Sequence, residues 1–392
     1  MISSDSILIK GGKLIWPEGA EERGDILINK GIIADLGGDI ESLHAEVIDA
    51  QGMWVAPGFI DLHVHGGGGL EVMDGSYEAI CTMAKVHSKG GTTAFLPSAA
   101  TASHDEFIAA IDATLQGMEK GTGGAQVLGI NLEGPYLNPK KRGAQRAEDV
   151  RVPDIHEFEE FWEASKGTIK LITVAPEVEG AIDFIKMVRS MGVRISVGHS
   201  DATFEEAINS FEAGVSHVTH TFNGMSGLHH REPGLAGAAL LHPSVMAELI
   251  ADGVHIHPKM MELFFKVKGR EGICLVTDAI SGMGLPDGIH TLAGERVIVD
   301  EGVCRIEDGT LAGSTLTMSK AVKNMIRLVG VSLQDAIRMA TLNPAMAIGI
   351  EAQKGDLKPG MDGDIVILDE NLDVVFTIAR GEVIYSKSKG FE

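Results

Sequence analysis

Cysteine is scarce in this 392-residue sequence. Its three cysteines, Cys81, Cys274 and Cys304, lie far apart, and no two of them have the CxxC spacing of a thiolate metal site. An odd, widely spaced set provides neither a disulfide framework nor a cysteine-ligated zinc site. We therefore expect a chain that folds in a reducing compartment.

Basic residues are also few, because 33 Lys and Arg stand against 55 Asp and Glu, for a net charge of −22. A surface of that sign repels phosphate backbones and anionic lipid headgroups. The composition therefore argues against a nucleic-acid or membrane partner. An anionic small molecule would need a local basic pocket.

Long hydrophobic runs are absent as well. No uninterrupted apolar segment approaches the roughly 18 residues of a membrane helix, and the start, MISSDSILIK, has no basic stretch followed by a long apolar one. Hydrophobic residues still make up 44% of the chain, enough for the core of a large α/β domain and a smaller one. We expect a soluble cytoplasmic protein.

Both ends of the chain consist of short β-prone segments broken by Gly and Asp. The first are ILIKGGKLIW, DILINKGIIADLG and AEVIDAQGMWVAPG, and the segment from GDLKPG onward has the same texture. Such segments are typical of hairpin strands. We expect residues 1–57 and 358–392 to form one small β-sandwich domain, and residues 58–357 to form a second domain.

The middle of the chain alternates short apolar runs with amphipathic stretches of roughly 10 to 18 residues. There are eight such runs: GFIDLHVH, TTAFLPS, VLGINLEGP, IKLITVAPE, RISVGHS, HVTHTFN, AELIADGVH and ICLVTDAI. Eight successive βα units predict an α/β fold of the (β/α)8 TIM-barrel type. A doubly wound open sheet would carry a glycine fingerprint opening the first helix, whereas here GGGG follows His65 and opens no obvious helix.

Polar residues mark the ends of five of these runs. His63 and His65 are two apart, which places both side chains on one face of a strand. Taken singly, a buried histidine is more often a core residue with a hydrogen-bond partner. A group of imidazoles and carboxylates at the C-terminal strand ends of a barrel instead predicts a divalent metal site. We expect the glycines after His65 to let the loop pass close to metal and substrate. The set is His63, His65, Glu133, His199, His220 and Asp278.

The strand-end histidines, the aspartate after the eighth run and the paired terminal segments resemble the amidohydrolase superfamily. Within it, the sequence is similar to N-acetylglucosamine-6-phosphate deacetylases from about Ile7 to the C-terminus. The segments that carry this likeness are NLEGPYLNPKKRGAQ, VGHSDATFEEA, THTFNGM, REPGLAGA, ADGVHIHP, LVTDAI and LAGSTLTM.

The resemblance implies one or two divalent metals per subunit, from among Zn, Fe, Mn and Co. One metal would be held by Glu133, His199 and His220, and a second by His63 and His65 with Glu133 bridging. Some family members replace the two HxH histidines by Gln and Asn and use one metal, so the intact HVH favours two. Other amidohydrolases carry a carboxylated lysine on strand four, where this chain has only Lys170, near the strand's start.

The resemblance also implies the catalytic residue. Asp278 would take a proton from the attacking water and give it to the leaving amine. The alternative is that Asp278 only ligates metal. Gln145 stands where some members carry a histidine that polarises the substrate carbonyl, so we assign that polarisation to the metal at the HxH side, and the role of Gln145 stays open.

The implied substrate is a phosphorylated amino sugar. Arg231 would bind the phosphate with its planar donor fork, or else form an ordinary ion pair with Glu232. The family resemblance implies a homodimer in which Arg231 is able to reach the neighbouring active site. The other implied substrate contacts are Asn223 and Gly224 at the phosphate, His255 at a sugar hydroxyl, Ala144, and Leu311, Ala312 and Gly313 of the segment that ends at Ser314.

The activity implied is hydrolysis of N-acetyl-D-glucosamine 6-phosphate to D-glucosamine 6-phosphate and acetate. Three alternatives stay open. A deacetylase acting on N-acetylgalactosamine 6-phosphate would share the metal and phosphate groups. A cyclic amidase would need the strand-four lysine and has no use for Arg231. A non-catalytic scaffold would be expected to lose metal ligands, and here every expected ligand position is filled.

Overall fold

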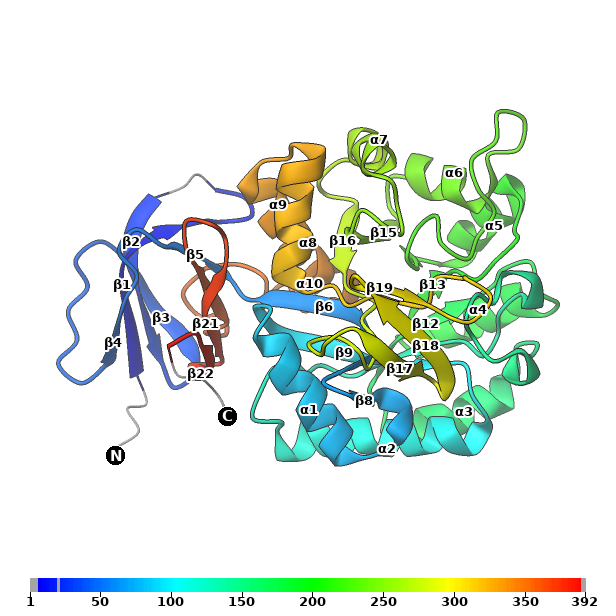
Figure 1. Ribbon diagram of the computed structural model, residues 1–392, viewed down its shortest axis with the longest axis horizontal. Helices are drawn as coiled ribbons and strands as arrows, with labels where there is room; N and C mark the ends of the chain where they lie inside the picture. Colours follow the sequence, from blue (N-terminus) through cyan, green and yellow to red (C-terminus); the bar gives the residue numbers. More distant parts are fainter. Residues whose placement is uncertain (1–5, 20–21, 389–392) are drawn as a thin grey trace.

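The computed structural model describes residues 6–19 and 22–388. A sheet built from both ends of the chain lies beside a barrel ringed by helices (Figure 1). This confirms the predicted (β/α)8 barrel with a β unit made of the terminal segments. The domain boundaries at 57/58 and 357/358 stay a prediction, and the outermost stretches of that prediction, 1–5 and 389–392, lie outside the described residues, as do 20 and 21.

The barrel contains eight parallel strands, one from each of the eight apolar runs. They are β6 (Phe59–Val64), β9 (Thr92–Ala100), β11 (Ile130–Glu133), β12 (Ile169–Val174), β13 (Arg194–Val197), β14 (His217–Val218), β15 (Met246–Ile250) and β16 (Ile273–Val276), with the short β10 (Gln126–Val127) beside β9. The ring closes between β16 and β6, since the Asp278 N–H donates to the His63 carbonyl at 2.9 Å and Val64 bridges to Ala279.

Helices cover the outside of the barrel (Figure 1). Polar side chains cap the N-termini of α1 and α5, because the hydroxyls of Ser76 and Thr203 accept hydrogen bonds from first-turn amides. The helices are α1 (Tyr77–Ser88), α2 (His104–Lys120), α3 (Ile155–Ala164), α4 (Ala181–Ser190), α5 (Phe204–Ala213), α6 (Gly234–Leu241), α7 (Pro258–Lys268), α8 (Met318–Asn324), its π-helical continuation Met325–Val329, α9 (Leu333–Ala340) and α10 (Leu342–Ile348).

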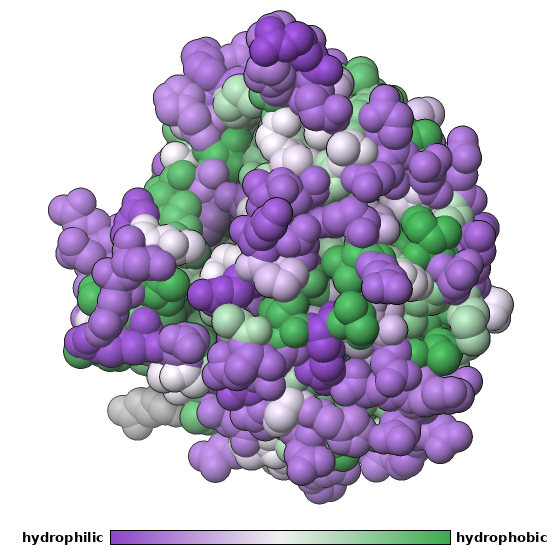
Figure 2. Space-filling model, turned by 90° about the vertical axis from the view of Figure 1, so that its right-hand side faces the viewer, coloured by the Kyte–Doolittle hydropathy of each residue, from purple (hydrophilic) through white to green (hydrophobic). Residues whose placement is uncertain are grey.

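Apolar side chains of these helices fill the layer between helices and strands. Phe107, Phe158 and Phe161 are completely buried there. The face turned to the viewer in Figure 2 is mostly hydrophilic, with hydrophobic side chains scattered over it. No helix in the described part of the chain is long and apolar enough to cross a membrane.

The terminal sheet draws on both ends of the chain. Its strands are β1 (Ser6–Leu14), β2 (Glu22–Asn29), β3 (Ile32–Gly37), β4 (Glu46–Asp49), β5 (Trp54–Pro57), β20 (Ile365–Leu368), β21 (Val374–Ala379) and β22 (Glu382–Ser386). Strand β1 pairs with β4 along its first half and with β5 along its second half. Its pairing with β2 on the other side has a register shift between Ile9 and Gly12. A Cβ at Gly12 would lie 2.4 Å from Val55, so this crossing requires glycine.

A three-stranded antiparallel arm follows strand eight and was not expected from the sequence. It consists of β17 (Gly288–Leu292), β18 (Glu295–Asp300) and β19 (Val303–Arg305). Alternate residues of β18 are buried, and Val297 and Val299 pack with Leu292 and Cys304 against Ile280. The arm therefore has its own small core beside the segment that leaves strand eight. Two short strands, β7 (Gly66–Gly67) and β8 (Leu70–Glu71), shape the loop after β6.

Candidate metal centre

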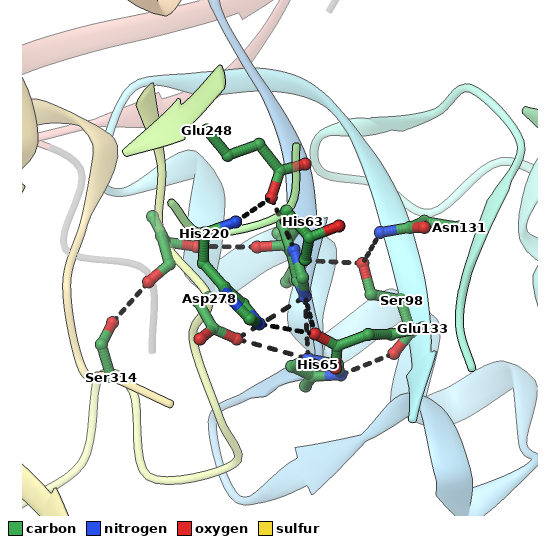
Figure 3. Close-up of polar contacts among 12 residues, drawn as sticks. His63, His65, Ser98, Asn131, Glu133, His220, Glu248, Asp278 and Ser314 are labelled. Carbon is green, nitrogen blue, oxygen red and sulfur yellow. Dashed lines mark hydrogen bonds and ion pairs between the residues drawn. The ribbon is translucent and has the colours of Figure 1, made fainter. Parts of the chain in front are cut away.

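The six residues predicted to carry chemistry meet in one buried cluster at the C-terminal ends of the barrel strands. Figure 3 labels five of them: His63, His65, Glu133, His220 and Asp278. The six residues come from five strands that are distant in the sequence. His63 lies on β6 with His65 directly after it, Glu133 ends β11, and His199, His220 and Asp278 each lie two residues beyond β13, β14 and β16.

Two sets of potential ligands share one carboxylate. His63, His65 and Glu133 form the first set, and Glu133, His199 and His220 form the second, with ligand atoms within 4.8 Å of one another in each. Glu133 Oε1 lies 2.9 Å from His220 Nε2, 3.1 Å from His199 Nε2 and 3.3 Å from His63 Nε2, while Oε2 lies 3.2 Å from His65 Nε2. Glu133 is thus placed to bridge two cations.

The tautomers of two of the four histidines, His65 and His199, fit metal binding. His65 Nδ1 lies 2.8 Å from the Ser98 carbonyl oxygen, and His199 Nδ1 lies 2.8 Å from the Lys141 carbonyl oxygen. A carbonyl can only accept, so Nδ1 is the donor and the neutral ring carries its lone pair on Nε2. These Nε2 lone pairs point toward Glu133, so the two imidazoles and the carboxylate are placed to ligate a divalent metal together.

The electrostatics of the cluster favour bound positive charge. Burial acts to raise the pKa of Glu133, but His63 and His199 outweigh it and hold the pKa well below its usual value. Burial alone would lower the pKa of His63, yet Glu133 and Glu248 hold it well above the ordinary range. Burial likewise acts to raise the pKa of Asp278, but the hydrogen bond to His65 and the nearby imidazoles keep it low, so Asp278 is ionised.

Three of these residues have an unusual backbone conformation. The φ angles of His199, His220 and Asp278 are 47°, 24° and 50°, in a region that residues other than glycine seldom adopt. Each occurs two residues beyond a barrel strand, where the chain turns toward the cluster. Backbone strain of this kind persists where the surrounding structure enforces it, and it gathers at functional sites.

A cavity of about 200 Å³ opens directly beside the cluster. Of the residues predicted to contact substrate, seven line it: Ala144, Asn223, Gly224, His255, Leu311, Ala312 and Gly313. The sequence analysis did not single out Gly143, Leu292 and Thr310, which line it too. Leu292 is the last residue of β17 in the unexpected arm, and Thr310 lies beyond the arm's last strand, β19. The alternation in ERVIVDEGVCRI was the sequence signal for that arm.

Arg231 is not brought to this cavity within its own chain. It is exposed on the loop before α6, with Nη1 2.8 Å from His230 Nε2. Its alternative, an ion pair with Glu232, is not formed, because the Glu232 carboxylate accepts from the amides of Phe204 and Gly234. No Lys or Arg among the described residues lines the cavity.

Gln145 contacts the shared carboxylate. Its Oε1 accepts from the Thr101 N–H at 2.8 Å, which fixes the orientation of the amide, and its Nε2 donates to Glu133 Oε2 at 2.5 Å. The side chain is buried. Gln145 therefore orients Glu133, a role that the sequence left open.

Glu248 was missed by the sequence analysis. It is completely buried on β15, and its Oε2 lies 3.0 Å from His63 Nδ1 and accepts from the His220 N–H at 3.0 Å. The available signal was a carboxylate within the apolar run AELIADGVH, where an unpartnered charge would be costly.

The glycines after His65 lie close to neighbouring segments of the chain. A Cβ at Gly66 would lie 2.5 Å from the Ser281 amide nitrogen, and one at Gly68 would lie 2.8 Å from Val86. His87 Nε2 donates to the Gly66 carbonyl at 2.9 Å. None of the four glycines lines the cavity, and the structure shows them packed closely against α1 and the segment after strand eight.

A parallel (β/α)8 barrel with two histidine sets sharing a carboxylate at its mouth defines a metal-dependent hydrolase of the TIM-barrel class. The chain matches the amidohydrolase family over residues 54–387, and it belongs to that family. It is accordingly an enzyme.

Relatives share its whole length. It is 40% identical over 376 residues to an N-acetylgalactosamine-6-phosphate deacetylase of Escherichia coli O157:H7, covering 96% of this chain and 98% of that protein. It is 35% identical over 387 residues to an N-acetylglucosamine-6-phosphate deacetylase of Bacillus subtilis (strain 168), covering 97% and 98%.

Solved structures agree in fold. One is a mutant N-acetyl-D-glucosamine-6-phosphate deacetylase from Mycobacterium smegmatis in complex with N-acetyl-D-glucosamine-6-phosphate, with a TM-score of 0.92, 29% identity and coverage of 97% of this chain and 100% of that one. Another is an N-acetylglucosamine-6-phosphate deacetylase from Thermotoga maritima, with a TM-score of 0.88, 35% identity and the same coverage.

Proposed function

We propose that this enzyme hydrolyses the acetamide of N-acetyl-D-glucosamine 6-phosphate to D-glucosamine 6-phosphate and acetate. One observation carries the proposal: the carboxylate of Asp278 lies 3.3 Å from His65 Nε2 and 3.7 Å from His63 Nε2, at the floor of the cavity. An ionised carboxylate beside two potential metal sites is the arrangement that amide hydrolysis needs. We infer the substrate class, a phosphorylated N-acetyl amino sugar, from the relatives, which are deacetylases of such sugars.

Two divalent cations would be bound by two different sets of ligands. Glu133, His199 and His220 would bind one, and His63 and His65 would bind the other with Glu133 shared. Bound there, the metals would lower the pKa of a coordinated water and polarise the acetamide carbonyl. Zn, Fe, Mn and Co all suit this mixture of imidazole and carboxylate donors.

Asp278 performs the proton transfers. Its ionised carboxylate accepts the proton of the attacking water and then delivers it to the amine nitrogen as the carbon–nitrogen bond breaks. His255 faces the same cavity, and its Nδ1 is 2.6 Å from Asp252 Oδ2, which leaves Nε2 for a sugar hydroxyl. We assign Asn223 and Gly224, which line the cavity, to the phosphate end of the substrate, and Ala144, Leu311, Ala312 and Gly313 to the rest of its wall.

Arg231 supports a proposed homodimer. Its guanidinium lies outside the cavity of its own chain, so we assign it to the active site of a neighbouring copy, where it would reach the phosphate. Three free cysteines fit the cytoplasmic location that we propose.

The galacto epimer is the second candidate substrate, favoured by the 40% identity to an N-acetylgalactosamine-6-phosphate deacetylase. The test is acetate release by the metal-replete protein from both phosphorylated epimers and from unphosphorylated N-acetylglucosamine. Fast turnover of the gluco phosphate alone supports the proposal, and preference for the galacto phosphate replaces it with the second candidate. No release from any of them overturns both and reopens the cyclic-amidase and scaffold alternatives.

A further inference from the structure

A second hollow adjoins the cavity and is lined by basic residues. This groove, of about 460 Å³, shares the lining residues Gly143, Gly224 and Thr310 with the cavity, so the two lie side by side. Its other lining residues are Pro139, Lys140, Lys141, Arg142 and Met225. Three consecutive cations thus stand at the mouth of the site, on a protein whose net charge is −22.

Two of these cations form no ion pair with a carboxylate in the described part of the chain. Lys140 is exposed and, among residues 6–19 and 22–388, has no ion-pair partner. Arg142 donates to the carbonyls of Gln145, at 2.5 Å, and Gly143, at 3.4 Å, which fix its position without neutralising it. Asp308 interacts with Arg142 only electrostatically.

The third cation is partly neutralised. Lys141 Nζ lies 3.2 Å from Asp201 Oδ1 and donates to the Met225 carbonyl at 3.3 Å. We therefore assign the attraction of the groove for anions to Lys140 and Arg142.

Gly224 joins the groove to the ligand cluster. Its φ is +56°, and a Cβ there would lie 3.0 Å from His199 Nδ1 and 3.2 Å from the Lys141 carbonyl oxygen. No acceptor is found for its N–H within the described chain. A glycine amide without a side chain lets an anion approach the backbone closely. An anion beside Gly224 would therefore meet both this amide and the basic side of the groove.

We infer that Lys140 and Arg142 add two cations of the same chain to the phosphate contact already proposed for the Gly224 amide, and that together they form a subsite for the phosphate monoester. The inference rests on the proposed function, because it places the phosphate at the end of the substrate away from the acetamide. A dianion gains most from cations whose charge is not already compensated. The subsite operates whether or not Arg231 of a partner subunit also contributes.

The test compares Lys140→Gln with Lys89→Gln in the full-length, metal-replete enzyme. Lys89 is an exposed lysine at the end of α1, at the opposite end of the barrel from the strand C-termini, so its substitution makes the same charge change away from the site. We expect Lys140→Gln to lower kcat/KM for the phosphorylated sugar by roughly fivefold. It should leave the unphosphorylated sugar unaffected, and Lys89→Gln should change neither.

Inorganic phosphate is the second probe. Its inhibition constant should weaken by a similar factor in Lys140→Gln, and Arg142→Lys should retain part of the affinity because it keeps the charge but loses the fork. Two results together would overturn the inference. Lys140→Gln would keep the wild-type preference for the phosphorylated over the unphosphorylated sugar, and Arg231→Gln would abolish that preference.

Failure of the proposed function would look different. The wild type would then release no acetate from either epimer, whereas failure of the subsite leaves wild-type turnover intact and removes only the effect of Lys140→Gln. In the first case, calorimetric binding of inorganic phosphate to the wild type and Lys140→Gln still decides whether the subsite exists. Equal affinity in the two proteins would overturn it.

Discussion

Glu248 Oε2 accepts one hydrogen bond from His63 Nδ1 and another from the backbone N–H of His220, each at 3.0 Å (Figure 3). A single carboxylate oxygen thus holds a member of each ligand set in place. Such a partner orients the imidazole and raises its basicity toward a metal.

We predict that Glu248→Gln weakens metal retention by roughly tenfold, because the amide keeps the shape but loses the charge that supports His63. The measurement is metal content by mass spectrometry after dialysis against graded chelator. Asp252→Asn is the control, since Asp252 contacts His255 and no predicted ligand. A variant that keeps its metal as tightly as the wild type would contradict this role.

Asp278→Asn should lower kcat by at least roughly a hundredfold, because an amide cannot accept the proton of the attacking water. Metal content should stay close to that of the wild type, as Asp278 belongs to neither ligand set. Turnover and metal content are measured on the same sample. A parallel loss of metal would favour the alternative in which Asp278 only ligates metal.

Chelation should lower both activity and thermal stability, since a metal that binds only the folded chain stabilises it, by about 4 kcal/mol at a thousandfold excess over Kd. Re-addition of Zn, Fe, Mn or Co should restore both. The double change His63→Gln with His65→Asn should reduce the metal bound at saturation from two equivalents to one. An unchanged stoichiometry would refute a second site at these histidines.

Glu71 anchors the arm that the sequence did not reveal. Its carboxylate accepts from the amides of Ala293, at 2.9 Å, and Gly294, at 3.4 Å, in the turn between β17 and β18. Because the end of β17 supplies Leu292 to the cavity wall, Glu71→Gln should raise KM severalfold with little change in kcat.

Hydrogen exchange over residues 288–305 should also quicken in Glu71→Gln, since the hydrogen bonds that hold the turn are weakened. Glu295→Gln, at an exposed position of the same turn, is the matched control. Unaltered exchange and KM in Glu71→Gln would show that the arm is held by its apolar core alone.

His87 should make stability depend on pH. Burial lowers its pKa to about 4, against the opposing effect of its hydrogen bond to the Gly66 carbonyl. Because the folded chain holds this ring neutral, its contribution is complete above about pH 6.5 and is lost as the pH falls toward 4, by up to roughly 3 kcal/mol.

The check is urea unfolding between pH 4 and pH 7. His87→Gln should flatten the decline in the free energy of unfolding toward acid, whereas substitution of the exposed His156 should not. If the slope of His87→Gln equals that of the wild type, His87 is not the group responsible.

The barrel was predictable because each strand comes from a short, mainly apolar run and most helices have an apolar stripe, and both patterns are local. The HxH pair was predictable for a related reason, since spacing by two residues fixes a shared face of a strand. The arm was overlooked because its strands are short and half exposed, so its alternation in ERVIVDEGVCRI is a weak signal.

By itself the sequence determined the order of the strands, the residue types at their ends and the family likeness, because these depend on neighbouring residues. Only the tertiary structure decided how closely Glu133 approaches both histidine sets, that Gln145 and Glu248 contact the ligand cluster, and that the glycines after His65 pack against α1. When the barrel closes, strand ends that lie up to about two hundred residues apart in the sequence come into contact. No local sequence pattern encodes the distances between them.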